Sequence, residues 1–347
     1  SASEKLRAQA GAPGARGRTP HPDPLMAVYT EVDVDTAAAL LRRLDAGTLT
    51  SMRGCAGGIE NTNYFVHSDK GDWVLTVFER LGFDQLPFYL GLMQHLARKG
   101  LPVPEPRTDA GGNFLHAIAG KPAALVNLLP GRSIDAPMLA HCSLLGVTLA
   151  RLHTAALDFP TQQPNLRGLD WWARTVPVVR PHVGRALAQR LDEELDFQQR
   201  FHAAASTQSL PRGPVHADLF RDNALFDGAP DSPRLSGVFD FYFAGVDHHV
   251  YDLAVCVNDW CVDLATGRLE PEHAEALLRA YHLHRPMGPA ELRALPGMRR
   301  AAALRFWLSR LADWHLPREA ALLQPKDPTH FERVLVDCVD NPWHPSL

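Results

Sequence analysis

The sequence is poor in the features of secreted, membrane-spanning or zinc-binding proteins. It has only five cysteines, an odd number, and no Cys-x-x-Cys pair, so neither a disulfide framework nor a zinc knuckle is indicated. No apolar run reaches the length of a transmembrane helix, and we predict no membrane partner. Reduced thiols in a cytoplasmic protein are the simplest interpretation of this composition.

Excess charge of one sign is also missing. The 35 Lys and Arg residues nearly balance the 39 Asp and Glu residues, and the formal net charge is −4. No Lys/Arg block resembles a basic arm, so we predict no nucleic-acid partner. Hydrophobic residues make up 46% of the 347 residues, which suits a globular protein with a sizeable core. The sequence leaves open whether the chain is a monomer or a homodimer.

Residues 1–25 lack apolar periodicity and are rich in Ala, Gly, Pro and Arg, so we expect a disordered leader. The pattern after Met26 predicts a small lobe over residues 26–130, which ends in the hinge Leu129-Pro130-Gly131. Its expected elements are helices and strands at 34–44, 49–78, 84–99, 113–118 and 123–128, with a hairpin turn at Lys70-Gly71-Asp72.

The remaining residues, 131–347, are mostly helical by their apolar spacing. Helices are expected at 136–156, 184–205, 251–264, 271–283, 289–315 and 328–338, interrupted by short strands near 215, 225 and 237. Strands followed by helices favour an α+β class with a bilobal architecture: an antiparallel-sheet lobe, then a larger helical lobe.

The most informative segment is 216–223, which reads HADLFRDN, followed by VFDF at 238–241. An Asp followed five positions later by an Asn is the spacing of a kinase catalytic loop, so Asp218 is the candidate catalytic carboxylate. Asn223 and Asp240 are candidate Mg²⁺ ligands, because Mg²⁺ prefers hard oxygen donors. His216 is expected to brace this loop. The alternative is that Asn223 and Asp240 are ordinary turn residues.

A second candidate segment, GCAGGIENTNY at 54–64, lies between two expected strands. Glycines let a backbone approach phosphates closely, and Asn and Thr add neutral donors, so Gly57, Gly58, Asn61, Thr62 and Asn63 are the candidate ATP-binding residues. No GK[ST] follows, which excludes a Walker loop. A plain glycine hairpin is the alternative. The pairs at His248-His249 and His282-x-His284 lack metal-ligand spacing.

These motifs resemble the aminoglycoside phosphotransferase and choline kinase superfamily, whose fold is like that of protein kinases. Within it, the segments GIENTNYF at 58–65, MAVYT at 26–30 and YDLA at 251–254 resemble bacterial homoserine kinases. One departure stands out. Most kinases of this fold carry a Lys or Arg on the third strand, paired with a helix Glu, but here those positions fall at Thr76 and near Tyr89.

The resemblance implies an ATP- and Mg²⁺-dependent kinase that phosphorylates L-homoserine for threonine biosynthesis. Charged or amide groups after the catalytic segment are candidates for substrate binding: Asp222, Asn258, Asp259 and Arg305. A kinase for another amino alcohol or aminosugar is an alternative, since tryptophans could form a cage for a choline-like acceptor. A nucleotide-binding pseudokinase is a third interpretation, favoured by the missing Lys–Glu pair and opposed by Asp218, Asn223 and Asp240.

Overall fold

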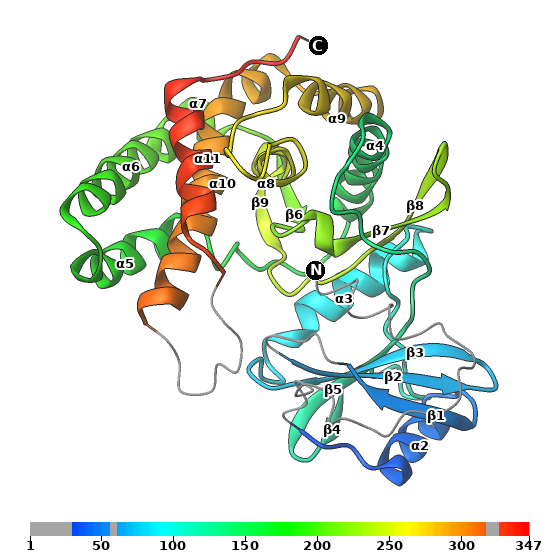
Figure 1. The fold of residues 1–347 in the computed structure, drawn as a ribbon. Coiled ribbons are helices and arrows are strands. Elements are labelled where there is room, and N and C mark those ends of the chain that lie inside the picture. The colour runs from blue at the N-terminus through cyan, green and yellow to red at the C-terminus, as the bar shows by residue number, and fades with distance from the viewer. Residues whose placement is uncertain (1–29, 56–60, 317–325, 347) are drawn as a thin grey trace, which may run out of the picture. The chain divides into compact units, whose positions relative to one another are not determined.

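The computed structural model describes residues 30–55, 61–316 and 326–346 (Figure 1). The expected leader at 1–25, and the candidates Gly57 and Gly58, lie outside the described residues. The chain divides into two units. The first contains the chain up to Asp135 together with Asp222–Ala229 and Ser236–Phe239, and the second contains the rest.

An antiparallel five-stranded sheet forms the centre of the first unit, in the order β1-β2-β3-β5-β4. Its strands are β1 (Leu49–Gly54), β2 (Asn61–Ser68), β3 (Gly71–Phe78), β4 (His116–Ile118) and β5 (Lys121–Asn127). Asn63 on β2 pairs with Thr76 on β3. The β2–β3 turn is Asp69-Lys70, one residue earlier than expected, because Gly71 already pairs with Ser68.

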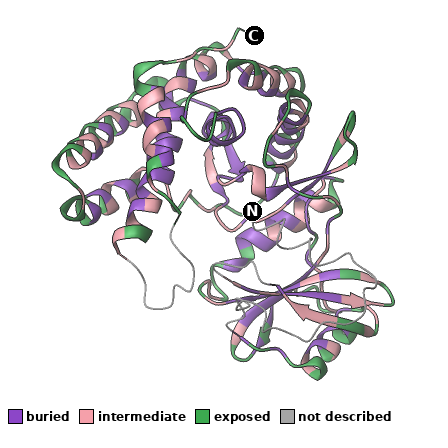
Figure 2. Ribbon diagram, in the orientation of Figure 1, coloured by how far each residue is buried: buried purple, intermediate pink, exposed green. Residues whose placement is uncertain are grey.

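Helix α2 (Val34–Arg43) begins at Asp33, whose Oδ1 accepts the Thr36 N–H at 2.6 Å as an N-cap. Its apolar side is buried against one face of the sheet (Figure 2). The residues of this core share that face or that side of the helix: Ala37, Leu40, Leu41, Tyr64, Val66, Trp73, Leu75 and Val77. Since side chains alternate along a strand, the odd positions of β2 and the even positions of β3 point to the opposite face.

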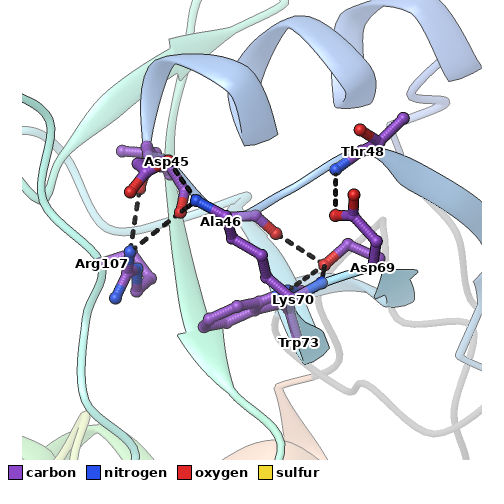
Figure 3. A network of polar contacts seen from close by, with 9 residues as sticks. Asp45, Ala46, Thr48, Asp69, Lys70, Trp73 and Arg107 are labelled. Atoms are coloured by element: carbon purple, nitrogen blue, oxygen red, sulfur yellow. Dashed lines mark hydrogen bonds and ion pairs between the residues drawn. The ribbon is translucent and has the colours of Figure 1, made fainter.

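A polar network fixes the end of α2 to the sheet (Figure 3). Lys70 pairs with the Asp45 carboxylate, and the Arg107 guanidinium donates to the Asp45 carbonyl at 3.2 Å. The Thr48 N–H donates to the carboxylate of Asp69 at 2.6 Å. These contacts satisfy backbone groups that the helix end and the turn would otherwise leave unpaired.

The first unit also contains helix α3 (Leu86–Arg98). The second unit is mainly helical. Its helices are α4 (Leu139–Ala156), α5 (Leu169–Val179), α6 (Arg185–Ala203), α7 (Ala205–Gln208), α8 (His249–Trp260), α9 (Pro271–His284), α10 (Pro289–His315) and α11 (Thr329–Asp340). Among the described helices, none is long and apolar enough to cross a membrane.

Two small ribbons interrupt the helices. Strand β6 (Arg212–Val215) pairs antiparallel with β9 (Gly245–His248), and β7 (Ala224–Ala229) lies beside β8 (Ser232–Val238). The expected α+β class, with an antiparallel sheet followed by a mainly helical part, is confirmed. Helix α5 and strand β9 were not predicted from the sequence.

Candidate active site

The segment that carries Asp218 follows directly from β6. Val215, the last residue of β6, pairs with Gly245 on β9, and this pairing fixes where the chain leaves the ribbon. Ala217 then adopts a left-handed conformation with φ 61°. A non-glycine residue in this region is costly and persists only where its surroundings hold it, which is common at functional sites.

Asp252 on α8 holds this strained turn. Its carboxylate accepts the N–H of His216 at 2.9 Å and the N–H of Ala217 at 2.7 Å, and its side chain is 0% exposed. His153 on α4 contacts the same carboxylate through Nε2 at 3.0 Å. Burial alone would raise the pKa of Asp252, but the hydrogen bond and charge of His153, with those of His216, lower it below its usual range. Asp252 is therefore ionised and anchors the two residues before Asp218.

The ring of His216 completes the turn. Its Nδ1 accepts the backbone N–H of Asp218 at 3.2 Å, and the ring packs on Phe241 at 4.5 Å between centroids. His216 is buried. The imidazole therefore orients the backbone of Asp218, and the bracing role of His216 stays a prediction.

The brace extends deeper into the second unit. His153 Nδ1 contacts the hydroxyl of Tyr281 on α9 at 2.7 Å, and His249 stacks on His153 at 4.6 Å between centroids. Sequence reasoning assigned no role to Asp252 or His153. The YDLA segment that contains Asp252 was a usable signal, whereas His153 looked like any polar residue on an apolar helix.

Asn223 and Asp240 are joined through the backbone. Asn223 ends a short 3-10 turn, and its carbonyl accepts the N–H of Phe239, the residue before Asp240, at 3.1 Å. Asp240 has φ 66°, a second strained non-glycine residue. No group of three or more His, Cys, Asp or Glu side chains suited to a metal occurs in the described part of the chain.

The donor chemistry fits Mg²⁺ nonetheless. One amide oxygen and one carboxylate are hard ligands, and Mg²⁺ usually takes only one or two protein carboxylates, filling its shell with water and substrate phosphates. A full protein cage is therefore not required at Asn223 and Asp240.

The candidates after the catalytic segment have different environments. Asp259 accepts the backbone N–H of Arg221 at 2.8 Å and pairs with its guanidinium. Asn258 is buried, and its side chain bridges the Nε of Arg299 at 3.0 Å and the Arg299 carbonyl at 2.7 Å. These contacts favour bracing over substrate binding for both residues. Asp222 is partly exposed, in the short turn that ends at Asn223.

The three nucleotide candidates on β2 do not share one face. Thr62 is fully buried on the α2 side, where its hydroxyl donates to Glu79 at 2.6 Å and accepts the Thr30 N–H at 3.1 Å. Asn61 and Asn63 point the other way, as strand alternation requires. The Asn63 carbonyl also accepts the Cys55 N–H at 2.8 Å, which closes the base of the loop.

The place of the missing lysine is filled by a neutral pair. The Thr76 hydroxyl donates to the Asn63 side-chain oxygen at 2.7 Å. Tyr89 on α3 is buried and packs edge-on against Phe88. Lys121 and Glu79 form an ion pair, but Glu79 bonds to Thr62 and so lies on the α2 side of the sheet. This pair does not replace the missing one.

Comparison with known proteins identifies the family of the chain. The profile of the phosphotransferase enzyme family matches residues 51–304. A homoserine kinase of Polaromonas naphthalenivorans (strain CJ2) is 55% identical over 318 residues, which are 92% of this chain and 99% of the relative. A homoserine kinase of Ralstonia nicotianae (strain ATCC BAA-1114 / GMI1000) is 54% identical, with 89% of this chain and 95% of the relative covered.

Solved structures share the fold at low sequence identity. An amicoumacin kinase in complex with AMP-PNP, Ca²⁺ and Ami has a TM-score of 0.62 at 16% identity, with 91% of this chain and 96% of the other covered. A spectinomycin phosphotransferase in complex with ADP and spectinomycin has a TM-score of 0.61 at 11% identity, with coverages of 90% and 99%. The profile match and the close relatives together show that the chain belongs to the phosphotransferase enzyme family and, within it, to the homoserine kinases.

Proposed function

We propose that this chain transfers the γ-phosphoryl group of ATP to the side-chain hydroxyl of L-homoserine, forming O-phospho-L-homoserine and ADP. The relatives named homoserine kinase, which match over nearly their whole length, carry this proposal. The reaction would serve threonine biosynthesis. A cytoplasmic location and the choice between monomer and homodimer stay predictions.

Asp218 is the catalytic carboxylate of this proposal. Phosphoryl transfer passes through a loose transition state, so the carboxylate mainly orients the attacking hydroxyl and accepts its proton late. The clamp of Asp252 on residues 216 and 217, and the hydrogen bond from the Asp218 N–H to His216, fix the backbone that presents this carboxylate. Such preorganisation lowers the entropic part of the barrier.

Asn223 and Asp240 are the residues that would hold Mg²⁺. The bound ion supplies positive charge that neutralises the phosphate oxygens. Gly57, Gly58, Asn61 and Asn63 are proposed to hold the phosphates through backbone and amide donors, because position 76 offers a hydroxyl instead of an ammonium. For Thr62, whose hydroxyl is already engaged, only the backbone is proposed to take part.

A coupled ADP-release assay tests the function. With MgATP we expect turnover of L-homoserine and little turnover of choline, ethanolamine, L-serine, L-threonine or an aminoglycoside. Asp218→Ala should lower kcat roughly 10²- to 10⁴-fold. Asp231→Ala, in the exposed β7–β8 turn, is the matched control and should leave kcat unchanged.

Each other result has a defined meaning. Preference for choline or an aminoglycoside would replace homoserine as the acceptor. ATP binding without turnover of any acceptor would favour the pseudokinase interpretation. An unchanged rate in Asp218→Ala would remove Asp218 from the mechanism.

A further inference from the structure

Asp247 is a partly buried carboxylate that the phosphoryl-transfer scheme above does not use. It lies on β9, its side chain is 16% exposed, and its oxygens accept the Asn165 side-chain amide at 2.8 Å and the His248 N–H at 2.7 Å. Burial alone would raise its pKa, but hydrogen bonds from His248 and Asn165 lower it, so Asp247 is ionised. Its one ion-pair contact in the described structure is the ring of His248, at 3.3 Å. A largely shielded anion with no lysine or arginine partner among the described residues suits a cationic ligand.

Arg305 on α10 supplies the opposite charge in the same unit. It is 3% exposed, and one guanidinium nitrogen donates to the Ser309 hydroxyl at 2.5 Å. Its guanidinium carbon lies 4.5 Å from the ring centroid of Phe306, 5.1 Å from that of Phe243 and 5.7 Å from that of Trp171. Aromatic faces hold the planar guanidinium in place, and its forked donors match the geometry of a carboxylate.

Side-chain contacts connect the two groups. Arg305 and Arg167 both lie over the rings of Trp171 and Phe243. The Arg167 N–H donates to the Asn165 side chain, which in turn bonds to Asp247.

Tyr251 on α8 is buried, which raises its pKa well above the usual range; the charge of Arg305 and the Asn165 side chain oppose this shift, and the charge of Asp247 adds to it. The hydroxyl therefore stays protonated. It is buried, and no described residue makes a hydrogen bond of good geometry with it, although the Asn165 side chain is close enough to lower its pKa. Buried hydroxyl groups are nearly always well paired, so this one points to a ligand.

These groups are tied to the catalytic segment by the β6–β9 ribbon. Asp247 is two residues from Gly245, which pairs with Val215, the residue before His216. Phe243, beneath Arg305, is three residues from Asp240 in the sequence. Gly245 has a packing role, since a Cβ there would lie 2.8 Å from the backbone N of Asn165 and would push away the residue that orients Asp247.

We propose that Asp247 and Arg305 form the amino-acid subsite of the acceptor pocket: Asp247 binds the α-ammonium of L-homoserine, Arg305 binds the α-carboxylate, and the Tyr251 hydroxyl donates to the bound zwitterion. The proposal rests on the proposed function. It explains selection for an amino acid, because choline and aminoglycosides have no carboxylate to meet Arg305. Asn165 positions Asp247 and does not itself contact the substrate.

Two truncated acceptors test each charge separately. 3-Aminopropan-1-ol keeps the hydroxyl and the ammonium but lacks the carboxylate, and 4-hydroxybutanoate keeps the hydroxyl and the carboxylate but lacks the ammonium. With the full-length protein and MgATP, Arg305→Gln and Asp247→Asn should each lower kcat/KM for L-homoserine roughly 30- to 1,000-fold, mainly through KM. Arg305→Gln should leave kcat/KM for 3-aminopropan-1-ol within about 3-fold of wild type, and Asp247→Asn should do the same for 4-hydroxybutanoate, since the deleted charge has no partner there.

Controls separate a subsite from a general defect. Arg310→Gln, on the same helix and also over an aromatic ring, should behave as wild type. KM for ATP should be unchanged in Arg305→Gln and Asp247→Asn. If Arg305→Gln does not fold, Arg305→Lys and Tyr251→Phe take its place, with a smaller rise in KM for L-homoserine expected of both.

An equal loss of activity towards L-homoserine and the truncated acceptors would overturn the subsite, as would an unchanged KM for L-homoserine in Asp247→Asn. Failure of the wild type to phosphorylate L-homoserine would instead refute the proposed function itself. The two failures are therefore distinguishable.

Discussion

At the scale of single residues, the second unit buries Asp252 in its charged form and His249 in its neutral form. Asp252 stays charged because His153, His216 and two backbone N–H groups stabilise the carboxylate. His249 has no such support. Neither of its ring nitrogens has a hydrogen-bond partner among the described residues, and the ring stacks on His153.

His249 should make the stability of the protein depend on pH. Burial, reinforced by the charges of His153 and Arg285, lowers its pKa to about 2, whereas an unfolded histidine titrates near 6.5, at about its reference value. Between these values the unfolded state binds one more proton than the native state. The contribution of neutral His249 to the free energy of unfolding is therefore complete above pH 6.5. It is lost as pH falls, by about 1.4 kcal/mol per pH unit.

The measurement is urea unfolding of wild type and His249→Phe at pH 6.5 and pH 5. Phenylalanine retains the stack on His153 but cannot titrate. We expect the free-energy difference between the two proteins to shift by about 2 kcal/mol in favour of the variant over this interval. The free-energy difference at a single pH also includes packing effects, so only its change with pH tests the role of His249. Parallel stability curves would show that His249 does not carry this pH dependence.

At the scale of elements, close helix packing overrides local propensity in α4. Gly146 lies inside this helix, where glycine normally costs about 1 kcal/mol relative to alanine. A Cβ at Gly146 would overlap the carbonyl oxygen of Leu277 on α9 and approach the Tyr281 nitrogen at 3.1 Å. The glycine thus allows α4 and α9 to touch, and these helices carry His153 and Tyr281.

Gly146→Ala should therefore destabilise the protein although it improves helix propensity. We expect a loss of roughly 1–3 kcal/mol, because both neighbours are backbone atoms that cannot move aside cheaply. Ser143→Ala, on the same helix at a partly exposed position, is the control and should be neutral or slightly stabilising. Chemical denaturation measures both. Stabilisation by Gly146→Ala would mean that the two helices separate without cost.

Long helices were predictable from the sequence, and elements that depend on distant partners were not. The helix expected at 289–315 matches α10 to the residue, and helices α2 and α9 were predicted within one residue. Strand β9 has only four residues and no alternation, and it exists because β6 pairs with it. For the same reason Asp218, Asn223 and Asp240 could be selected as candidates by motif, whereas the roles proposed for Asp247 and Tyr251 depend on neighbours far away in the sequence.

At the scale of the whole molecule, the first unit is completed by residues from late in the chain. Arg132 and Phe226 exchange two backbone hydrogen bonds, of 3.0 and 2.9 Å. The Val238 N–H donates to the Pro102 carbonyl at 2.7 Å, and the Ser236 hydroxyl donates to the Pro130 carbonyl at 2.6 Å. The expected boundary near residue 130 describes the order of elements along the chain. The sequence pattern does not show that residues 222–229 and 236–239 also belong to the first unit.

A fragment of residues 26–135 should consequently be only marginally folded. It lacks four hydrogen bonds worth roughly 0.5–1.5 kcal/mol each, a large part of the ~5–15 kcal/mol that stabilises a typical domain. It also loses the buried side chains of Phe226 and Val238. Trp73 is the only tryptophan in this fragment and is buried in the full chain, so its fluorescence reports the core directly. We expect solvent-exposed emission and no cooperative thermal transition.

Fusing residues 222–239 to the fragment through a flexible linker should restore both buried emission and cooperativity, because the linker lets the missing segments return to their places. Cooperative unfolding of the unfused fragment would show instead that the sheet and α2 alone supply enough buried apolar surface to fold.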